Sequence, residues 1–185
     1  MGRVSAYRDR MTSRERFMKE TPQPDAIVAL VEELTRYPWP KNQSEKDALF
    51  KRLGWSHRQQ FPANTNSAGD VADFFQLETR DDGPPIVATS RELGGLIEAI
   101  HVDLRMDSAP PDSEATQCFE AILSQLTNLH GEPSIPWHGQ RGLRKMWNVN
   151  GIDIDITWND SRSSLTIGIQ DERFFADVEA YARNN

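Results

Sequence analysis

Three aspartates near the end of the chain are the side chains best suited to chemistry. Asp153 and Asp155 alternate with apolar residues in Ile152–Trp158, and Asp160 follows in the next turn. Residues two apart in a strand point to one face and lie about 7 Å apart. That spacing could hold a divalent cation, divide acid and base roles, or present charge to another protein. A strand with one buried face needs polar residues there in any case, so a merely solvated face is the remaining alternative.

Two other side chains have chemical potential. His101 and Asp103 share one face of a second predicted strand, where a carboxylate could orient the imidazole toward a nucleophile. Cys118 is the single cysteine, and it lies beside an apolar helical stripe, so we expect a buried small side chain. The chain contains no GxSxG, HExxH, Walker or dinucleotide-binding glycine pattern. We therefore expect no catalytic residue, no metal site and no cofactor.

Aromatic residues in loops form a second group of candidates. Trp39 lies between two prolines, and Trp137 and His138 follow another proline. Tryptophan is a frequent anchor in protein interfaces, so these residues are candidates for partner contact, with local packing as the alternative. Trp147 and Trp158 have the strand parity of core residues, and we expect them to be buried.

The candidate aspartates belong to a predicted three-stranded meander over residues 145–170. Asn150-Gly151 is a strong signal for a two-residue hairpin turn, in which both central residues need positive φ. After this turn the apolar residues alternate with Asp153, Asp155 and Thr157. The pattern predicts a sheet with one core face and one acidic face left to solvent.

Apolar periodicity predicts the other elements. Helices are expected from Asp25 to before Pro38, from a Ser44 cap to Gly54, from a cap at Ser113 or Asp112 to Gly131, and from Asp171 to Arg183. Strand candidates occupy residues 58–61, 72–79, 86–89 and 96–106. The sequence therefore predicts an α+β fold, with an antiparallel sheet of five or six strands and helices packed on one face. We expect residues 1–24 to be a flexible basic arm and residues 25–185 to be a single domain.

Charge is distributed unevenly along the 185 residues. Residues 1–20 carry a formal charge of +3 and the remainder carries −10. Binding to nucleic acid depends on Lys and Arg neutralising phosphates, so an acidic body makes nucleic acid an unfavourable partner and a basic protein a favourable one. Because the chain has neither an apolar run of about 18 residues nor a signal-peptide pattern, we expect no membrane insertion and a cytoplasmic location.

Several short motifs follow one another along the chain in a recognisable order. They are a helical hairpin that ends in Leu53-Gly54-Trp55, a helix that ends in Leu129-His130-Gly131-Glu132-Pro133, a loop tryptophan at Trp137, and Trp147 before the Asn-Gly hairpin. Together they cover residues 24–170 and resemble an uncharacterised actinobacterial family. Members of that family resemble immunity proteins encoded near secreted polymorphic toxins.

The resemblance implies a function without catalysis. An immunity protein binds its cognate toxin domain in the cytosol and covers the active site of the toxin. Asp153, Asp155 and Asp160 would then be charge partners, and Trp39, Trp137 and His138 would be contact residues. The alternatives are a secretion chaperone or adaptor that binds an effector, and a metal-dependent or hydrolytic enzyme that uses Asp153, Asp155 and His101. The oligomeric state stays open.

Overall fold

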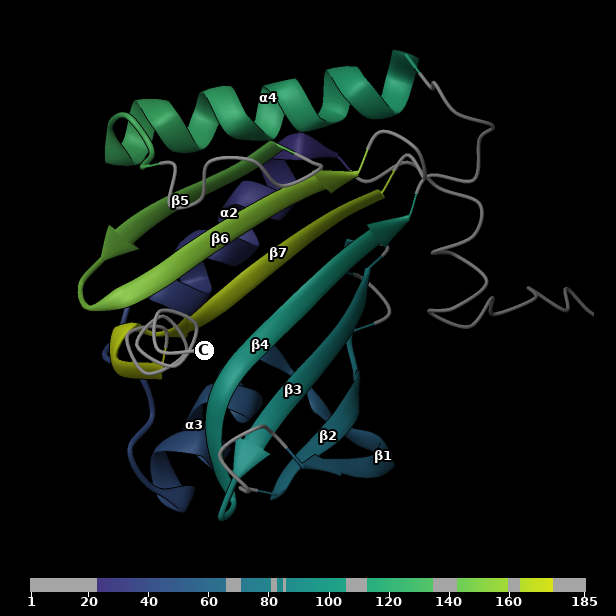
Figure 1. Ribbon diagram of the computed structural model, residues 1–185, viewed down its shortest axis with the longest axis vertical. Coiled ribbons are helices and arrows are strands. Elements are labelled where there is room, and N and C mark those ends of the chain that lie inside the picture. Colours follow the sequence, from purple (N-terminus) through teal and green to yellow (C-terminus); the bar gives the residue numbers. More distant parts are fainter. Residues whose placement is uncertain are drawn as a thin grey trace, which may run out of the picture.

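The computed structural model describes residues 23–65, 71–80, 83–84, 86–105, 113–134, 143–159 and 164–174. These residues form an α+β fold built on one seven-stranded sheet, as Figure 1 shows. The fold class is confirmed, and the strand count is slightly above the predicted five or six. The difference arises in residues 56–93. The apolar alternation there is weak, but all three strand candidates of this region form strands of the sheet.

The elements follow one another in a simple order. The helices are α2 (Pro24–Thr35), α3 (Gln43–Leu53) and α4 (Ser113–His130). The strands are β1 (Ser56–Thr65), β2 (Val71–Glu78), β3 (Val87–Leu93), β4 (Leu96–Arg105), β5 (Leu143–Val149), β6 (Ile152–Asn159) and β7 (Ser164–Asp171). None of the helices among the described residues is long and apolar enough to cross a membrane.

The sheet is antiparallel throughout, in the order β1-β2-β3-β4-β7-β6-β5. Strands β1 to β4 follow each other as hairpins. The chain then crosses over through α4 to the far edge and returns as a meander, so that β7 pairs with β4. The predicted Asn-Gly hairpin joins β5 to β6, with φ of 56° at Asn150 and 77° at Gly151.

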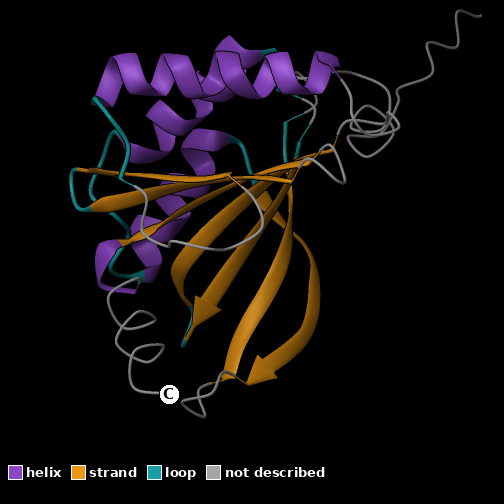
Figure 2. Cartoon of the chain, turned by 45° about the horizontal axis from the view of Figure 1, so that its top comes forward, coloured by secondary structure: helices purple, strands orange, loops and turns teal. Residues whose placement is uncertain are grey.

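The core lies between the sheet and the helices, which Figure 2 shows gathered on one side of the strands. The alternation predicted for the meander is confirmed, because Ile152, Ile154 and Ile156 are fully buried. The register places Ile167 of β7 opposite both Ile156 and Val102. On the helix side, Phe119 of α4 stacks on Trp158 with ring centroids 5.2 Å apart. Trp147 and Trp158 are buried, as expected.

An ion pair between Arg52 and Glu33, at 2.7 Å, links the first two helices, and the start of α3 needs one correction. The sequence predicted Ser44 as the cap of α3, but the cap is Asn42, whose side chain accepts a hydrogen bond from the Glu45 amide at 3.0 Å. Glu45 reaches back to accept from Asn42 Nδ2 at 2.8 Å. This reciprocal pairing over three residues favours Asn42 over Ser44. Gly54 ends the helix in the left-handed region, as predicted.

Candidate functional site

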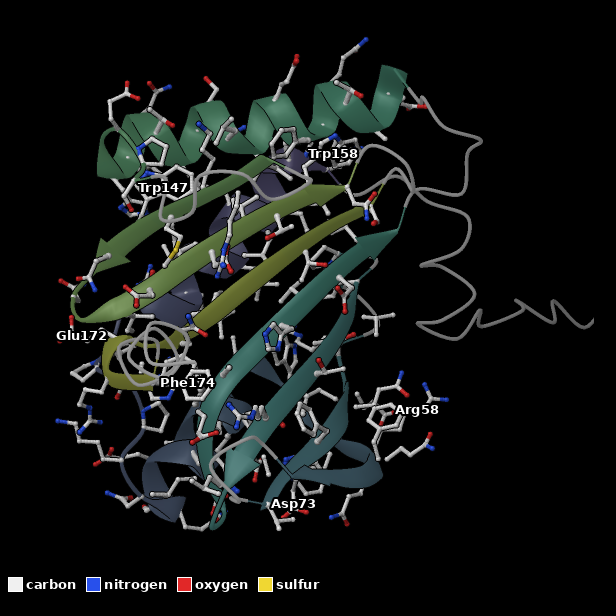
Figure 3. All side chains as sticks on the ribbon, in the orientation of Figure 1. Arg58, Asp73, Trp147, Trp158, Glu172 and Phe174 are labelled. Carbon is white, nitrogen blue, oxygen red and sulfur yellow. The ribbon has the colours of Figure 1, made fainter. Side chains whose placement is uncertain are left out.

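The sheet face opposite the helices carries most of the polar candidates. Strand alternation places Asp153 and Asp155 of β6 on this face, together with His101 and Asp103 of β4. Arg144 and Asn148 of β5 and Thr166 of β7 share it. We call this surface the polar face. Figure 3 shows its side chains toward the viewer.

Asp155 is held by an arginine from the neighbouring strand. Arg144 donates two hydrogen bonds to its carboxylate, at 2.8 Å to Oδ1 and 2.6 Å to Oδ2. The Asp155 side chain is 17% exposed and that of Arg144 is 28% exposed. Two-point pairing of this kind fixes the orientation of both groups. Asp155 is therefore a positioned carboxylate whose charge is partly offset, rather than the free charge that the sequence pattern predicted.

Asp153 departs further from the sequence expectation. The prediction of a solvent-facing carboxylate is wrong, because Asp153 is only 8% exposed. The reason is the chain after β7, where Glu172 packs beside the β5–β6 turn and its amide donates to Gly151 O at 3.2 Å (Figure 3). Asn148 Nδ2 donates to both carboxylates, at 2.9 Å to Asp153 Oδ1 and 3.1 Å to Glu172 Oε2.

Asp153 has a shifted pKa. Desolvation raises the pKa of its carboxyl, and the negative charges of Glu172, Asp171 and Asp155 raise it further, while the Asn148 hydrogen bond opposes the shift. The two aspartates thus share a strand face but differ in environment. Asp155 has a cation as its partner, and Asp153 has an amide and several anions.

His101 and Asp155 flank the same glycine. His101 lies across from Gly168 in the β4–β7 register, and Asp155 lies across from Gly168 in the β6–β7 register. Burial lowers the pKa of the His101 imidazole; Asp103 and Asp155 oppose this shift, and Arg91 adds to it. A neutral imidazole at neutral pH follows. Asp103 accepts a hydrogen bond from Thr166 Oγ1 at 2.7 Å.

The structure therefore places His101 and Asp155, two described residues of the enzyme alternative, on one face of the sheet, but no hydrogen bond links them. The His101 and Asp155 backbones are separated by two strand spacings, roughly 10 Å. Among the described residues, no hydrogen bond joins the His101 ring to an acidic side chain. The same part of the chain contains no group of three His, Cys, Asp or Glu side chains placed to hold a metal ion.

Trp39 lies in the core rather than at the surface. It is 4% exposed, and its indole N–H donates to Ile97 O at 2.7 Å. This position agrees with the alternative of local packing, because the proline-flanked connector folds back onto the start of β4. Trp39 forms one wall of a cavity of about 410 Å³ between the connector and α3, which Tyr37 and Arg52 also line. Arg52 lies over the Tyr37 ring, 4.2 Å from its centroid.

The remaining predicted contact residues, Trp137, His138 and Asp160, lie outside the described residues. The prediction for Cys118 is confirmed, because the side chain is 5% exposed within α4. Burial raises the pKa of its thiol, and the nearby Glu114 adds to the shift. A thiol in this environment is a poor nucleophile.

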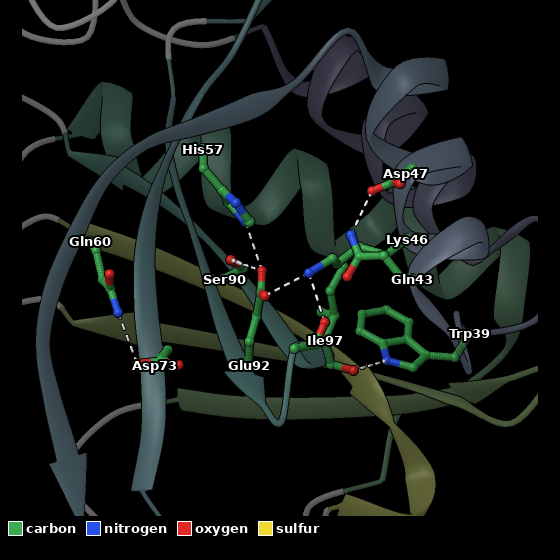
Figure 4. Close-up of polar contacts among 11 residues, drawn as sticks. Trp39, Gln43, Lys46, Asp47, His57, Gln60, Asp73, Ser90, Glu92 and Ile97 are labelled. Atoms are coloured by element: carbon green, nitrogen blue, oxygen red, sulfur yellow. Dashed lines mark hydrogen bonds and ion pairs between the residues drawn. The ribbon is translucent and has the colours of Figure 1, made fainter.

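A charged network that the sequence pattern did not predict lies beneath α3. Lys46 Nζ lies 2.8 Å from Glu92 Oε2 and donates to Gly95 O at 2.7 Å. The other carboxylate oxygen, Glu92 Oε1, lies 2.7 Å from His57 Nε2 and accepts from Ser90 Oγ at 3.2 Å (Figure 4). Lys46 is 5% exposed and Glu92 is 2% exposed.

Two signals in the sequence could have revealed this network. Lys46 occupies the apolar stripe of α3, three and four residues before Leu49 and Phe50. Glu92 has the parity of buried Ala88 in β3. A charged residue at each of two core-facing positions indicates that the two charges meet inside the protein.

Comparisons with family models, with curated proteins and with solved structures found no match to this chain.

Proposed function

We propose that this protein is a non-catalytic binding protein that neutralises a toxin domain by covering its active site in the cytosol. The observation that carries the proposal is the organisation of the polar face. Two of its partly exposed acidic side chains are held in place by neighbours on adjacent strands: Asp155 by Arg144, and Asp103 by Thr166. Positioned charges of this kind suit recognition of another folded protein, because these side chains are already ordered and lose little conformational entropy on binding.

The charge of the chain supports the same function. The formal net charge is −7. Toxins that act on nucleic acids or nucleotides need basic clefts to hold phosphate, and an acidic face is complementary to such a cleft. Complementary charge raises association rates and disfavours wrong partners. The neutral state of His101 favours binding to a basic cleft, because the imidazole adds no positive charge to the polar face.

The test begins with the genes next to this one. A neighbouring gene that encodes a toxin domain should be expressed together with this chain, and we expect growth to be rescued. We also expect a one-to-one complex by light scattering and calorimetry. Asp103→Lys, which reverses one charge on the polar face, should weaken the complex at least about tenfold, because close charge pairs across interfaces couple strongly.

The matched control is Glu120→Lys, which makes the same charge change on an exposed residue of α4. It should leave the affinity unchanged. Circular dichroism of both variants will show that each is folded. Binding that survives Asp103→Lys, or that falls equally with Glu120→Lys, would place the interface elsewhere, and failure of the neighbouring toxin domain to bind at all would contradict the proposed function.

A further inference from the structure

The two edges of the sheet are not equivalent. The outer edge of β5 is bridged by Ser134, which exchanges two backbone hydrogen bonds with Met146, at 2.9 and 3.0 Å. Strand β1 forms the opposite edge of the sheet and pairs with β2 alone (Figure 1). Within the described residues, no strand pairs with its outer side. An open edge presents backbone N–H and C=O groups to any extended chain that reaches it.

The first half of β1 is exposed on both faces. Every residue from Ser56 to Phe61 is exposed, although the His57 side chain is partly covered, and Phe61 is 39% exposed. Arg58 projects away from the sheet into solvent (Figure 3). The edge is therefore accessible to another chain along this stretch.

The start of this edge is anchored to the core. The His57 ring stacks on Phe75 with centroids 4.2 Å apart and meets Phe50 edge-on at 5.2 Å. Its Nε2 lies 2.7 Å from the buried Glu92 carboxylate. These contacts fix the start of β1 to the core, so a docking chain would meet a backbone that is already ordered, which lowers the cost of binding.

Charge distinguishes this edge from the rest of the protein. Residues Ser56–Thr65 include Arg58 but no acidic residue, although acidic side chains exceed basic ones in the whole chain. The nearest acids on β2 are Asp73, which accepts from Gln60 at 2.9 Å, and Glu78 at the strand end. A second copy of this chain is a poor occupant, because the β1 strand that it would add contains no acidic side chain to meet Arg58.

We propose that the β1 edge is a strand-addition surface that binds an extended acidic segment of a partner protein. The segment would pair with the regular stretch Gln59–Phe61, which lies between the two register shifts of β1. An acidic side chain of the segment would lie near Arg58, and an apolar one would lie on Phe61. Strand addition takes affinity from the backbone and specificity from alternate side chains. This surface is separate from the polar face and does not rest on the proposed function.

The full chain, labelled with ¹⁵N, should be titrated with two synthetic peptides, one of alternating valine and glutamate and one of alternating valine and lysine. We expect the acidic peptide to shift the backbone amide signals of residues 56–61 and to bind about threefold more tightly than the basic one, since one exposed charge pair contributes little. Arg58→Glu should reverse this order. Lys51→Glu, which makes the same change on an exposed residue of α3, should preserve it.

Three results would overturn the inference: no shift at residues 56–61 with either peptide, an unchanged preference in Arg58→Glu, or sedimentation showing a dimer that pairs through β1. None of these experiments contains a toxin, so their failure would leave the proposed function untouched. Loss of toxin binding in Asp103→Lys would likewise leave the edge proposal intact.

Discussion

At the scale of single residues, the polar face shows that equal positions in a pattern need not have equal environments. Asp153 and Asp155 are two residues apart on one strand, and the sequence pattern treats them alike. The structure gives Asp155 the guanidinium of Arg144 and gives Asp153 a buried site near Glu172. Their parity could be predicted from alternation. Their partners could not, because Arg144 lies in another strand and Glu172 follows the next one.

This difference predicts opposite effects of the same substitution. Asp153→Asn removes a buried charge that has three acidic neighbours, while its amide oxygen can still accept from Asn148. We expect the free energy of unfolding at pH 7 to rise by roughly 1 kcal/mol, the size of a single charge interaction at short range in water. Urea unfolding monitored by circular dichroism measures this change.

The sign of the pH dependence follows from the raised pKa of Asp153. The native protein holds the Asp153 proton to a higher pH than the unfolded chain does, so stability falls as pH rises from the unfolded pKa, about 4, through the native one. The gain from Asp153→Asn should therefore vanish below about pH 4. Asp155→Asn is the matched control, because it removes an ion pair and should destabilise by up to about 1 kcal/mol. Equal gains in both variants would contradict this account.

At the scale of elements, the attachment of α3 depends on the pair Lys46 and Glu92. A buried ion pair adds little net stability, yet removal of one member leaves an uncompensated buried charge. Glu92→Gln should therefore lower the free energy of unfolding by about 3 kcal/mol or more, because Lys46 remains buried and charged. The measurement is urea unfolding of the variant beside the parent protein.

A double variant supplies the control for that prediction. Lys46→Met with Glu92→Leu removes both charges and keeps apolar volume at the interface between α3 and β3. We expect it to lose much less stability than Glu92→Gln alone, because such replacements are often neutral or stabilising. A double variant at least as unstable as the single one would show that the network contributes strong net stability.

The elements themselves could largely be predicted from the sequence. Asn150-Gly151 specified its hairpin through positive φ, and the apolar stripe of α4 ended at Gly131, as expected. The pairing of β7 with β4 and the position of Trp39 could not be predicted in this way. Both depend on contacts between distant segments, such as Trp39 with Ile97, and local periodicity carries no information about such partners.

At the scale of the whole molecule, the crossover through α4 joins two halves of the chain in one core. The hairpins β1 to β4 precede the crossover, and the meander β5 to β7 follows it. They meet where β4 pairs with β7, and α2 from the first half packs against both α4 and β7 of the second. A continuous cluster of buried side chains runs through all of these elements except β1. We therefore expect the described part of the chain to unfold as one cooperative unit.

Ile167 lies at the junction of the two halves and provides the test. It is fully buried and pairs with Val102 on one side and Ile156 on the other. Ile167→Ala should lower the free energy of unfolding by about 3 kcal/mol through lost burial and a cavity. Because the halves share one core, amide hydrogen exchange should accelerate together in β2 and β3 and in β5 and β6. Leu129→Ala, at a side chain that is 55% exposed, should change little. Faster exchange confined to the meander would show instead that the two halves unfold separately, although their strands belong to one hydrogen-bonded sheet.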